Sequence, residues 1–311
     1  MKKLVIGLGA ALSYIVSVGF FFTHMMMYSK KKTDEEIIEK EKLGGHFVQK
    51  DFDELEKRNV SIPSRFGYSI KGYLIAPYKE KKFVIVSHGV TMNRYNSIKY
   101  MNLFLDRGYN VLIYDHRRHG ESGGKTTSYG YYEKFDLRSA VHWLKHQYGE
   151  NITLGIHGES MGAVSMLLYA GSLEDGADFY IADCPFEDLE QLLLYRLQAE
   201  IRIPKWLVMP IARLFLKWRD GYNMDEVSPI KIIDQIQKPI LFIHGKKDGT
   251  IPFSSSIHLY KQKPGLKKIY IAENAEHAMS FTMNQAEYER RIKLFLQESG
   301  IEEKELTELD I

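Results

Sequence analysis

The chain has 311 residues and 44% hydrophobic composition, which is enough for one large α/β core and gives no reason to expect a second globular domain. Its 42 basic and 40 acidic residues are interspersed and leave a net charge of +2, so the sequence lacks the electrostatic footprint of a nucleic-acid-binding protein. The single cysteine, Cys184, excludes any disulfide within the chain and does not fix the cellular compartment.

The N-terminal segment, residues 1–29, is typical of a membrane anchor. Residues 4–28 contain no Lys, Arg, Asp or Glu, and as a helix they would extend about 37 Å, enough to cross a hydrocarbon core of about 30 Å. A cleaved secretory signal is the alternative, with Ser17-Val18-Gly19 as its small-residue site, but the apolar run continues well beyond Gly19 and favours an uncleaved anchor. Lysines are denser after the span than before it, which favours a single-pass protein whose remainder is cytoplasmic.

Three further segments are distinguished by composition. Residues 30–58 are charged and helix-prone, and we interpret them as a solvated juxtamembrane spacer. The globular domain is expected to span residues 59–300 and to open with an antiparallel hairpin around a turn at residues 65–67. Residues 301–311 form an acidic tail that we expect to be solvated.

Short apolar strands then alternate with amphipathic helices. Strands are expected at residues 83–87, 111–114, 152–156, 179–182, 240–243 and 268–272, and helices at 98–107, 132–148, 163–172 and 285–298. Repeated strand-helix-strand units predict an α/β fold with a mostly parallel central sheet and helices on both faces. Ligand sites in such sheets lie beyond the carboxyl ends of the strands.

The pentapeptide Gly158-Glu159-Ser160-Met161-Gly162 lies at such a strand end. It follows the strand expected at 152–156 and opens the next helix. A sharp strand-to-helix turn holds the central serine in strained backbone with its hydroxyl exposed, and glycines are needed where Cβ atoms would collide. The pattern therefore predicts a nucleophile elbow at Ser160, with an ordinary Gly/Ser turn as the alternative.

A second strand end is expected to face the elbow. Residues 83–87 run into His88-Gly89-Val90, where the backbone N–H of Val90 could pair with the N–H of Met161. Two such donors would stabilise the oxyanion of a tetrahedral intermediate. We interpret His88 as a residue that organises this loop and not as a catalyst.

From residue 59 to residue 298 the chain resembles the α/β-hydrolase superfamily, specifically its lidded esterases and lipase-like serine hydrolases. The resemblance is carried by the elbow, by the two strand-end segments His88-Gly89 and residues 115–122, and by two later loops. In that superfamily the nucleophile, the acid and the histidine follow one another along the chain. The resemblance implies that Asp248, in the loop 245–252, is the acid, and that His277, in the loop after the last strand, is the histidine.

The chemistry requires all three groups. A serine hydroxyl is nearly unionised at neutral pH and must lose its proton to a base as it attacks a carbonyl, and His277 would be that base. Ionised Asp248 would orient the imidazole and stabilise its protonated form. Asp183 is the rival acid, because it also follows a strand.

Two other reactive groupings have plainer interpretations. Cys184 is expected to be a buried structural thiol and not a second nucleophile. Asp115, His116 and His119 could supply three ligands to zinc, but in the enzymes that the chain resembles this loop is structural. We therefore expect neither a metal nor an organic cofactor.

An insert interrupts the alternation at about residues 187–227 and is rich in large apolar side chains. Pro204 and Pro210 are expected to break it into two or more helices. The resemblance implies a helical lid, whose apolar face would form an acyl pocket above Ser160.

The sequence predicts a membrane-anchored serine hydrolase that cleaves carboxylic esters or thioesters of apolar acyl groups through an acyl-enzyme. Its partners would be a small-molecule ester and the membrane, and not nucleic acid. Two alternatives stay open: an amidase or peptidase on the same fold, and a non-catalytic binding protein that shares the fold.

Overall fold

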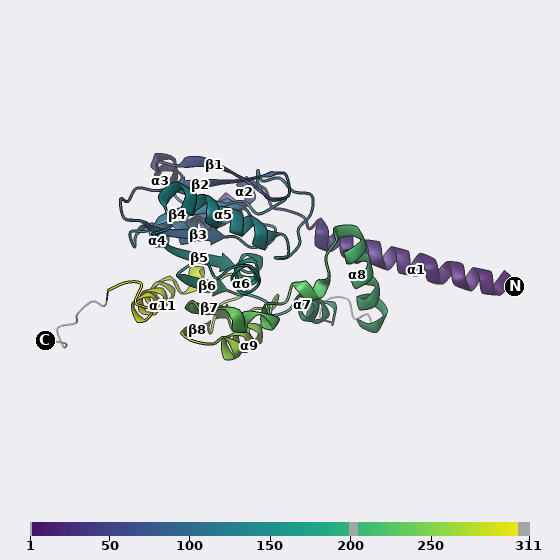
Figure 1. Ribbon diagram of the computed structural model, residues 1–311. Coiled ribbons are helices and arrows are strands. Elements are labelled where there is room, and N and C mark those ends of the chain that lie inside the picture. Colours follow the sequence, from purple (N-terminus) through teal and green to yellow (C-terminus); the bar gives the residue numbers. More distant parts are fainter. Residues whose placement is uncertain (1, 199–204, 304–311) are drawn as a thin grey trace.

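The computed structural model describes residues 2–198 and 205–303. Within them, eight strands form one sheet in the order β1-β2-β4-β3-β5-β6-β7-β8. The strands are β1 (Arg58–Pro63), β2 (Ser69–Ile75), β3 (Lys82–Ser87), β4 (Asn110–Tyr114), β5 (Thr153–Glu159), β6 (Phe179–Asp183), β7 (Ile240–Gly245) and β8 (Lys267–Ala272). The predicted α/β fold, with helices on both faces of a mostly parallel sheet, is confirmed (Figure 1).

The register of the sheet brings the important strand ends together. β1 and β2 form the expected antiparallel hairpin, and β2 is antiparallel to β4, whereas the remaining strands are parallel. Ser87 at the end of β3 pairs with Gly158 of β5, and Glu159 pairs with Asp183 at the end of β6. Residues that follow β3, β5 and β6 therefore lie at one edge of the sheet.

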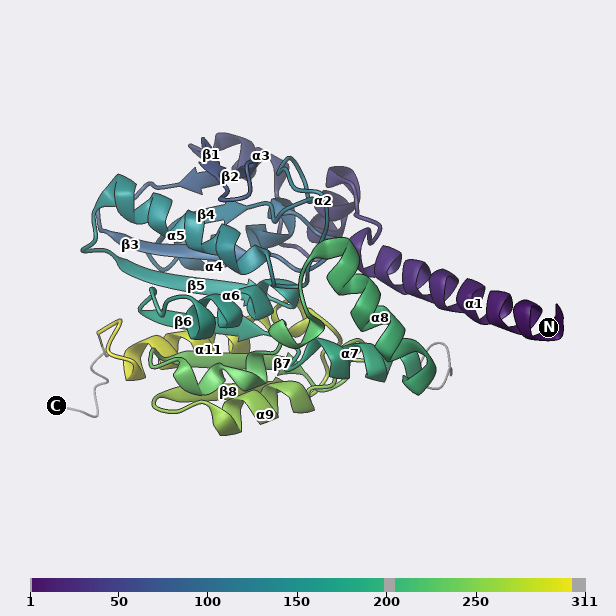
Figure 2. The ribbon, with the colours of Figure 1, turned by 45° about the vertical axis from the view of Figure 1, so that its right-hand side comes forward.

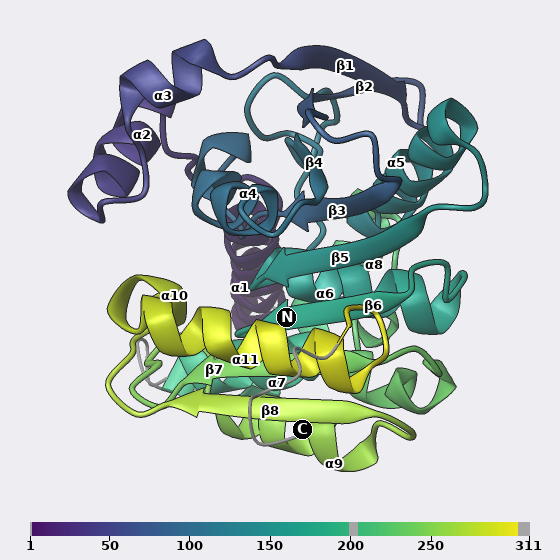
Figure 3. The same cartoon turned by 90° about the vertical axis from the view of Figure 1, so that its left-hand side faces the viewer.

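Helices cover the two faces of the sheet. The α-helices of the described residues are α1 (Lys2–Met27), α2 (Asp34–Leu43), α3 (Gln49–Glu54), α4 (Ile98–Leu105), α5 (Glu133–Tyr148), α6 (Met161–Ser172), α7 (Leu189–Arg196), α8 (Lys205–Asp220), α9 (Ser254–Gln262), α10 (Ser280–Met283) and α11 (Gln285–Glu298). α5, α6 and α9 pack on one face, and α3, α4 and α11 pack on the other (Figure 3). Because both faces are covered, β3, β4, β6 and β7 are almost entirely buried and apolar.

Residues 30–58 differ from the expected solvated spacer. α2 begins with a capping box between Thr33 and Glu36, and it packs against the 3-10 helix η1 (Arg94–Ser97). Ile37 and Glu41 lie one helical turn apart and are both buried, with 0% and 2% of their surface exposed. Part of this charged segment therefore belongs to the packed protein.

The insert at residues 187–227 contains α7, α8 and the short 3-10 helix η3 (Met224–Glu226), while residues 199–204, including Pro204, lie outside the described residues. The expectation that Pro210 breaks the insert is wrong, because α8 continues through it. Pro210 removes one helical hydrogen bond, to the carbonyl of Trp206, and both residues are exposed, so the cost of the unpaired carbonyl is low.

α1 extends from the side of the α/β unit and meets α8 near its C-terminal end (Figure 2). It is 26 residues long and apolar enough, by length and composition, to cross a membrane. Only 6% of its most apolar stretch is buried. Its last turns are different, because Thr23, Met26 and Met27 are buried. At Gly19 the two helices approach so closely that a Cβ atom would collide with the ring of Phe215.

Candidate active site

Ser160 lies in the sharp turn between β5 and α6. Its backbone has φ 54° and ψ −116°, a conformation that is rarely adopted by a residue with a side chain, and its N–H donates to the carbonyl of Asp183 at 2.7 Å. A Cβ atom at Gly158 would collide with the backbone of Ala163, and one at Gly162 would collide with the carbonyl of Ser87. Glycine is therefore required on both sides of the serine, as an elbow demands.

The structure brings Ser160, His277 and Asp248 together. Ser160 Oγ lies 3.0 Å from His277 Nε2, and His277 Nδ1 lies 2.6 Å from Asp248 Oδ2. With the ring proton on Nδ1, the imidazole donates to the carboxylate and accepts from the hydroxyl. This is the arrangement in which a histidine can take the proton of an attacking serine.

Asp248 is held by partners that the sequence analysis missed. Oδ1 accepts hydrogen bonds from the backbone N–H groups of Thr250 and Ile251, both at 2.8 Å, and His244 Nε2 lies 3.1 Å from Oδ2. Ser256 Oγ is 2.7 Å from His244 Nδ1, so with its proton on Nε2 the His244 ring donates to Asp248. Burial alone would raise the pKa of Asp248, but the hydrogen bonds from His244 and His277 hold it below its ordinary value. Asp248 is therefore a persistent anion.

The rival acid, Asp183, is turned toward other partners. Its Oδ2 accepts a hydrogen bond from Tyr288 at 3.0 Å and lies 3.2 Å from the hydroxyl oxygen of Tyr100, and it makes no hydrogen bond to His277 among the described residues. Burial and the neighbouring charge of Glu159 raise the pKa of Asp183 to about 6. The geometry favours Asp248 as the partner of the histidine.

The neighbouring Cys184 is fully buried, and burial raises the pKa of its thiol well above the ordinary value. Its sulfur lies within 4.8 Å of ligand atoms of Asp248 and His277, a grouping that could in principle hold a metal. A protonated thiol is a poor metal ligand, and Asp248 and His277 already satisfy each other. The donor set fits a structural thiol beside a hydrogen-bonded pair better than a metal site.

The side chains of the second candidate metal cluster are bonded mainly to protein groups, and His116 Nδ1 is the buried nitrogen that lacks a partner among the described residues of this cluster. Asp115 accepts from the backbone N–H and from the guanidinium of Arg94, at 2.8 and 3.1 Å. His116 Nε2 lies 2.9 Å from Ser87 Oγ, and His119 Nε2 accepts the N–H of Thr91 at 3.3 Å. These side chains form hydrogen bonds that shape the loops around β3 and β4 and do not converge on a shared space.

Val90 and Met161, the residues expected to supply an oxyanion hole, both lie beside Ser160. Both residues line the cavity at Ser160, and within the described part of the chain neither N–H donates a hydrogen bond. Met161 is the first residue of α6, where an N–H has no partner in the helix. His88 accepts the backbone N–H of His116 at 2.9 Å, which fits its predicted part in organising the loop.

A buried ion cluster lies directly behind the serine and was missed from the sequence. Glu159 Oε2 is 2.9 Å from Lys99 Nζ, and Glu41 Oε1 of α2 is 3.9 Å from the same nitrogen. Tyr100 also donates to Glu159, at 2.8 Å. Burial opposes ionisation of Glu159, but the charge of Lys99 outweighs it and lowers the pKa of Glu159 to about 2.

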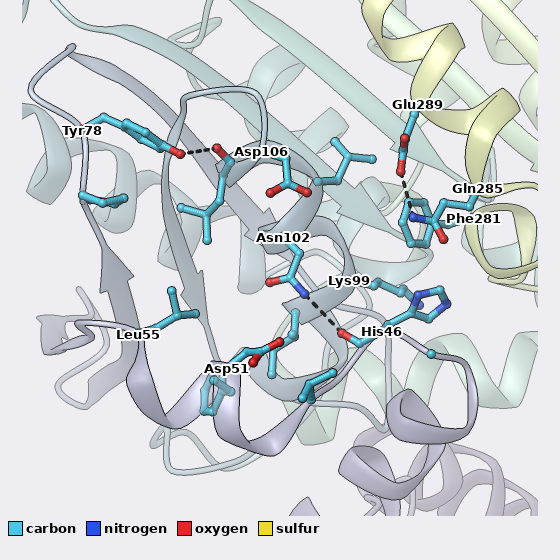
Figure 4. A pocket seen from close by; sticks show the side chains of 17 residues that line it. His46, Asp51, Leu55, Tyr78, Lys99, Asn102, Asp106, Phe281, Gln285 and Glu289 are labelled. Atoms are coloured by element: carbon cyan, nitrogen blue, oxygen red, sulfur yellow. Dashed lines mark hydrogen bonds between the residues drawn. The ribbon is translucent and has the colours of Figure 1, made fainter.

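The cavity at Ser160 has a volume of about 240 Å³. Its walls come from the strand-end loops, from α2 and from the insert, and include Lys40, Gly89, Val90, Tyr129, Phe186, Leu192, Arg196, Ile251 and His277. A larger cavity of about 520 Å³ lies between α3, α4 and α11 (Figure 4). It is lined by side chains such as His46, Asn102 and Glu289, and none of the three reactive residues reaches it. Volume alone would therefore have indicated the wrong place.

The sheet, its covering helices and the serine elbow define an α/β hydrolase, and the protein is a hydrolase of this class. The model of the prolyl oligopeptidase family, Peptidase_S9, matches residues 95–300, and the chain belongs to this family.

Individual relatives agree with this assignment. The chain is 55% identical over 297 residues to the Bacillus subtilis protein YqkD, whose name describes it as uncharacterized, with 95% of this chain and 97% of that protein covered. It is 28% identical over 218 residues to alpha/beta hydrolase domain-containing protein 17C of Xenopus tropicalis, covering 68% of this chain and 61% of that one. The solved structure of Pyrococcus furiosus esterase Pf2001 superposes with a TM-score of 0.66 at 26% identity, covering 81% of this chain and 95% of that one.

Proposed function

We propose that the protein is a serine hydrolase that cleaves carboxylic esters or thioesters of apolar acyl groups through an acyl-enzyme. The observation that carries the proposal is the chain of contacts from Ser160 Oγ to His277 Nε2, at 3.0 Å, and from His277 Nδ1 to Asp248 Oδ2, at 2.6 Å. These three side chains come from separate loops, and folding of the domain does not by itself require them to meet. Their contact is what acyl transfer by a serine requires.

In the proposed mechanism, Ser160 Oγ bonds to the carbonyl carbon while its proton passes to His277 Nε2. The carbonyl oxygen becomes an oxyanion held by the N–H groups of Val90 and Met161; one such donor contributes about 2.7–4 kcal/mol in a comparable hydrolase. The bond to the leaving alcohol or thiol then breaks, and His277 returns the proton to it. Water, deprotonated by the same imidazole, attacks the acyl-enzyme and frees Ser160.

An apolar acyl group is favoured by the walls of the cavity. Met161, Phe186, Leu192 and Ile251 line it, and each is buried. Such a surface binds hydrocarbon by removing it from water, whereas the polar side chains of Lys40, Thr91, Arg196 and Thr250 occupy other parts of the walls. The family match keeps an amidase or peptidase as the second candidate, because the same three residues cleave amides.

We also propose that α1 is an uncleaved, single-pass anchor and that the insert acts as a lid. Cleavage after Gly19 would remove the close approach of Gly19 to Phe215 and leave the buried Thr23 and Met26 on a frayed end. The lysines that follow α1 favour a cytoplasmic catalytic domain.

The test is labelling of the full-length protein with a fluorophosphonate, followed by turnover of matched substrates. Wild type and Ser172→Ala, a control at the exposed end of α6, should be labelled, and Ser160→Ala should not. p-Nitrophenyl butyrate and the anilide of butyrate then separate an esterase from an amidase. A folded wild type that is not labelled and turns over neither substrate would leave only the binding-protein alternative.

A further inference from the structure

A groove with apolar walls lies between the last turns of α1 and the insert helices. Its volume is about 100 Å³, and it is lined by Phe22, Met25, Met26, Tyr129, Leu193, Arg196, Leu197, Val208, Met209 and Ala212. Resting on the proposed hydrolase function, we propose that this groove holds the acyl chain of a substrate drawn from the membrane, while its carbonyl carbon lies at Ser160.

The groove adjoins the cavity at the serine. Tyr129 and Arg196 line both spaces, so the two meet along these side chains. Apart from Arg196 and the Tyr129 hydroxyl, the side chains of the groove are hydrocarbon or thioether. In the proposed complex, a flexible chain bonded to the carbonyl carbon at Ser160 crosses this shared border at Tyr129 and continues in an apolar environment.

The walls suit an alkyl chain. Met25, Met26 and Met209 supply three unbranched, polarizable side chains that adapt to the shape of a neighbour. The groove offers no row of backbone donors and acceptors that a peptide strand would need. Its occupant is therefore an acyl chain and not an extended peptide.

The position of the groove identifies the bilayer as the source of the chain. Met25 lines the groove and is 52% exposed, so the groove opens beside the membrane helix itself. On the adjacent α8, Trp206 and Trp218 are 72% and 69% exposed, and Trp218 packs edge-on against Phe20 of α1, with ring centroids 5.9 Å apart. Exposed tryptophans beside a membrane helix mark the level of the membrane interface, where the acyl chains of lipids are accessible.

The experiment uses the full chain in vesicles of diether-linked phosphatidylcholine, whose chains carry no ester bond. kcat/KM is measured for p-nitrophenyl butyrate and p-nitrophenyl octanoate in wild type and in Ala212→Trp, which fills the groove. Leu214→Trp on α8 is the control, because Leu214 is 64% exposed and does not line the groove. Ala212→Trp should lower the octanoate value about tenfold and leave the butyrate value within about twofold. Each buried methylene is worth about fourfold, so tenfold corresponds to displacing between one and two of the four methylenes that octanoate has beyond butyrate. Leu214→Trp should change neither.

Two other outcomes would each refute one proposal. Equal effects of Ala212→Trp on both esters in a folded protein would refute the proposed role of the groove in acyl binding, whereas a wild type that hydrolyses neither ester would refute the proposed hydrolase function. Should Ala212→Trp not fold, Met25→Trp at the exposed mouth must show the same selective loss. With p-nitrophenyl palmitate, the rate of hydrolysis must depend on the mole fraction of the ester in the vesicle. A rate that does not change when the ester is diluted with diether lipid would refute the bilayer as the source of the acyl chain.

Discussion

Lys99→Met tests whether the buried ion cluster supports the catalytic strand end. The side chain of Lys99 is 1% exposed, and its ammonium lies 2.9 Å from Glu159 and 3.9 Å from Glu41. At an effective dielectric constant of about 20, each attraction is on the order of 4–6 kcal/mol before desolvation is subtracted. Methionine keeps the length of the side chain but leaves two buried carboxylates without their shared cation. Loss of one partner from a buried pair typically costs about 3–5 kcal/mol.

We therefore expect Lys99→Met to lower the free energy of unfolding by about 3–5 kcal/mol and the Tm by roughly 10 °C. Urea unfolding of the full-length protein in detergent, followed by tryptophan fluorescence, measures the change. Lys50→Met is the control, since that side chain is 80% exposed in an i,i+4 pair, and its effect should stay within about 0.5 kcal/mol.

Two further measurements distinguish loss of the buried charge interactions from simple loss of packing. Without the cation, the native pKa values of the two carboxyl groups rise, so the variant loses stability as pH rises from 5 to 8. Adding Glu41→Gln removes one uncompensated charge, and the double variant should be more stable than the sum of the single effects by about 0.5–3 kcal/mol. A Lys99→Met effect below about 1 kcal/mol, or strict additivity with Glu41→Gln, would refute the reasoning.

Three other predictions follow from the site and the insert. Asp248→Asn should lower kcat by about four orders of magnitude, while Asp183→Asn should cost far less, and steady-state kinetics would show the reverse ranking if the acid were misassigned. Ionised Asp248 contributes stability that is present above its ordinary pKa of about 3.9 and is lost as pH falls toward its lower native pKa. The difference in unfolding free energy between wild type and Asp248→Asn should therefore be constant from pH 5 to 7 and shrink below pH 4. In vesicles, brominated lipid should quench Trp206 and Trp218 but not Trp143 on α5, and unquenched fluorescence from single-tryptophan variants would place α8 away from the bilayer.

Where the sequence was informative, the signal was local. The strand expected at residues 83–87 corresponds to β3, Lys82–Ser87, because a continuous apolar run is what a strand buried on both faces requires. Ser160 could be assigned to an elbow because the collisions that demand Gly158 and Gly162 involve backbone within a few residues or on the neighbouring strand. The convergence of loops after separate strands followed from the parallel sheet, whose strand ends share one edge.

Partners that depend on packing between distant elements could not be predicted in the same way. His244 lies on a buried strand, where a histidine is indistinguishable in sequence from a satisfied core residue, and only the fold places it 3.1 Å from Asp248. Lys99 lies on α4 among mostly apolar residues, and lysine is almost never fully buried unless it is paired. Its burial becomes intelligible only when Glu159 and Glu41 are both in place.

α2 shows why net charge is a poor guide to whether a segment is packed. Its ten residues are mostly charged, yet Ile37 and Glu41 lie on one face at a spacing of one turn, and that face is buried against the domain. The carboxylate of Glu41 reaches Lys99, which holds Glu159, the residue before Ser160. The segment that leaves α1 is therefore tied by charge to the strand end that carries the serine. A shift of α2 relative to the sheet would break the contact of Glu41 with Lys99 and uncover a buried cation, so the C-terminal end of α1 and the serine are constrained to keep one arrangement.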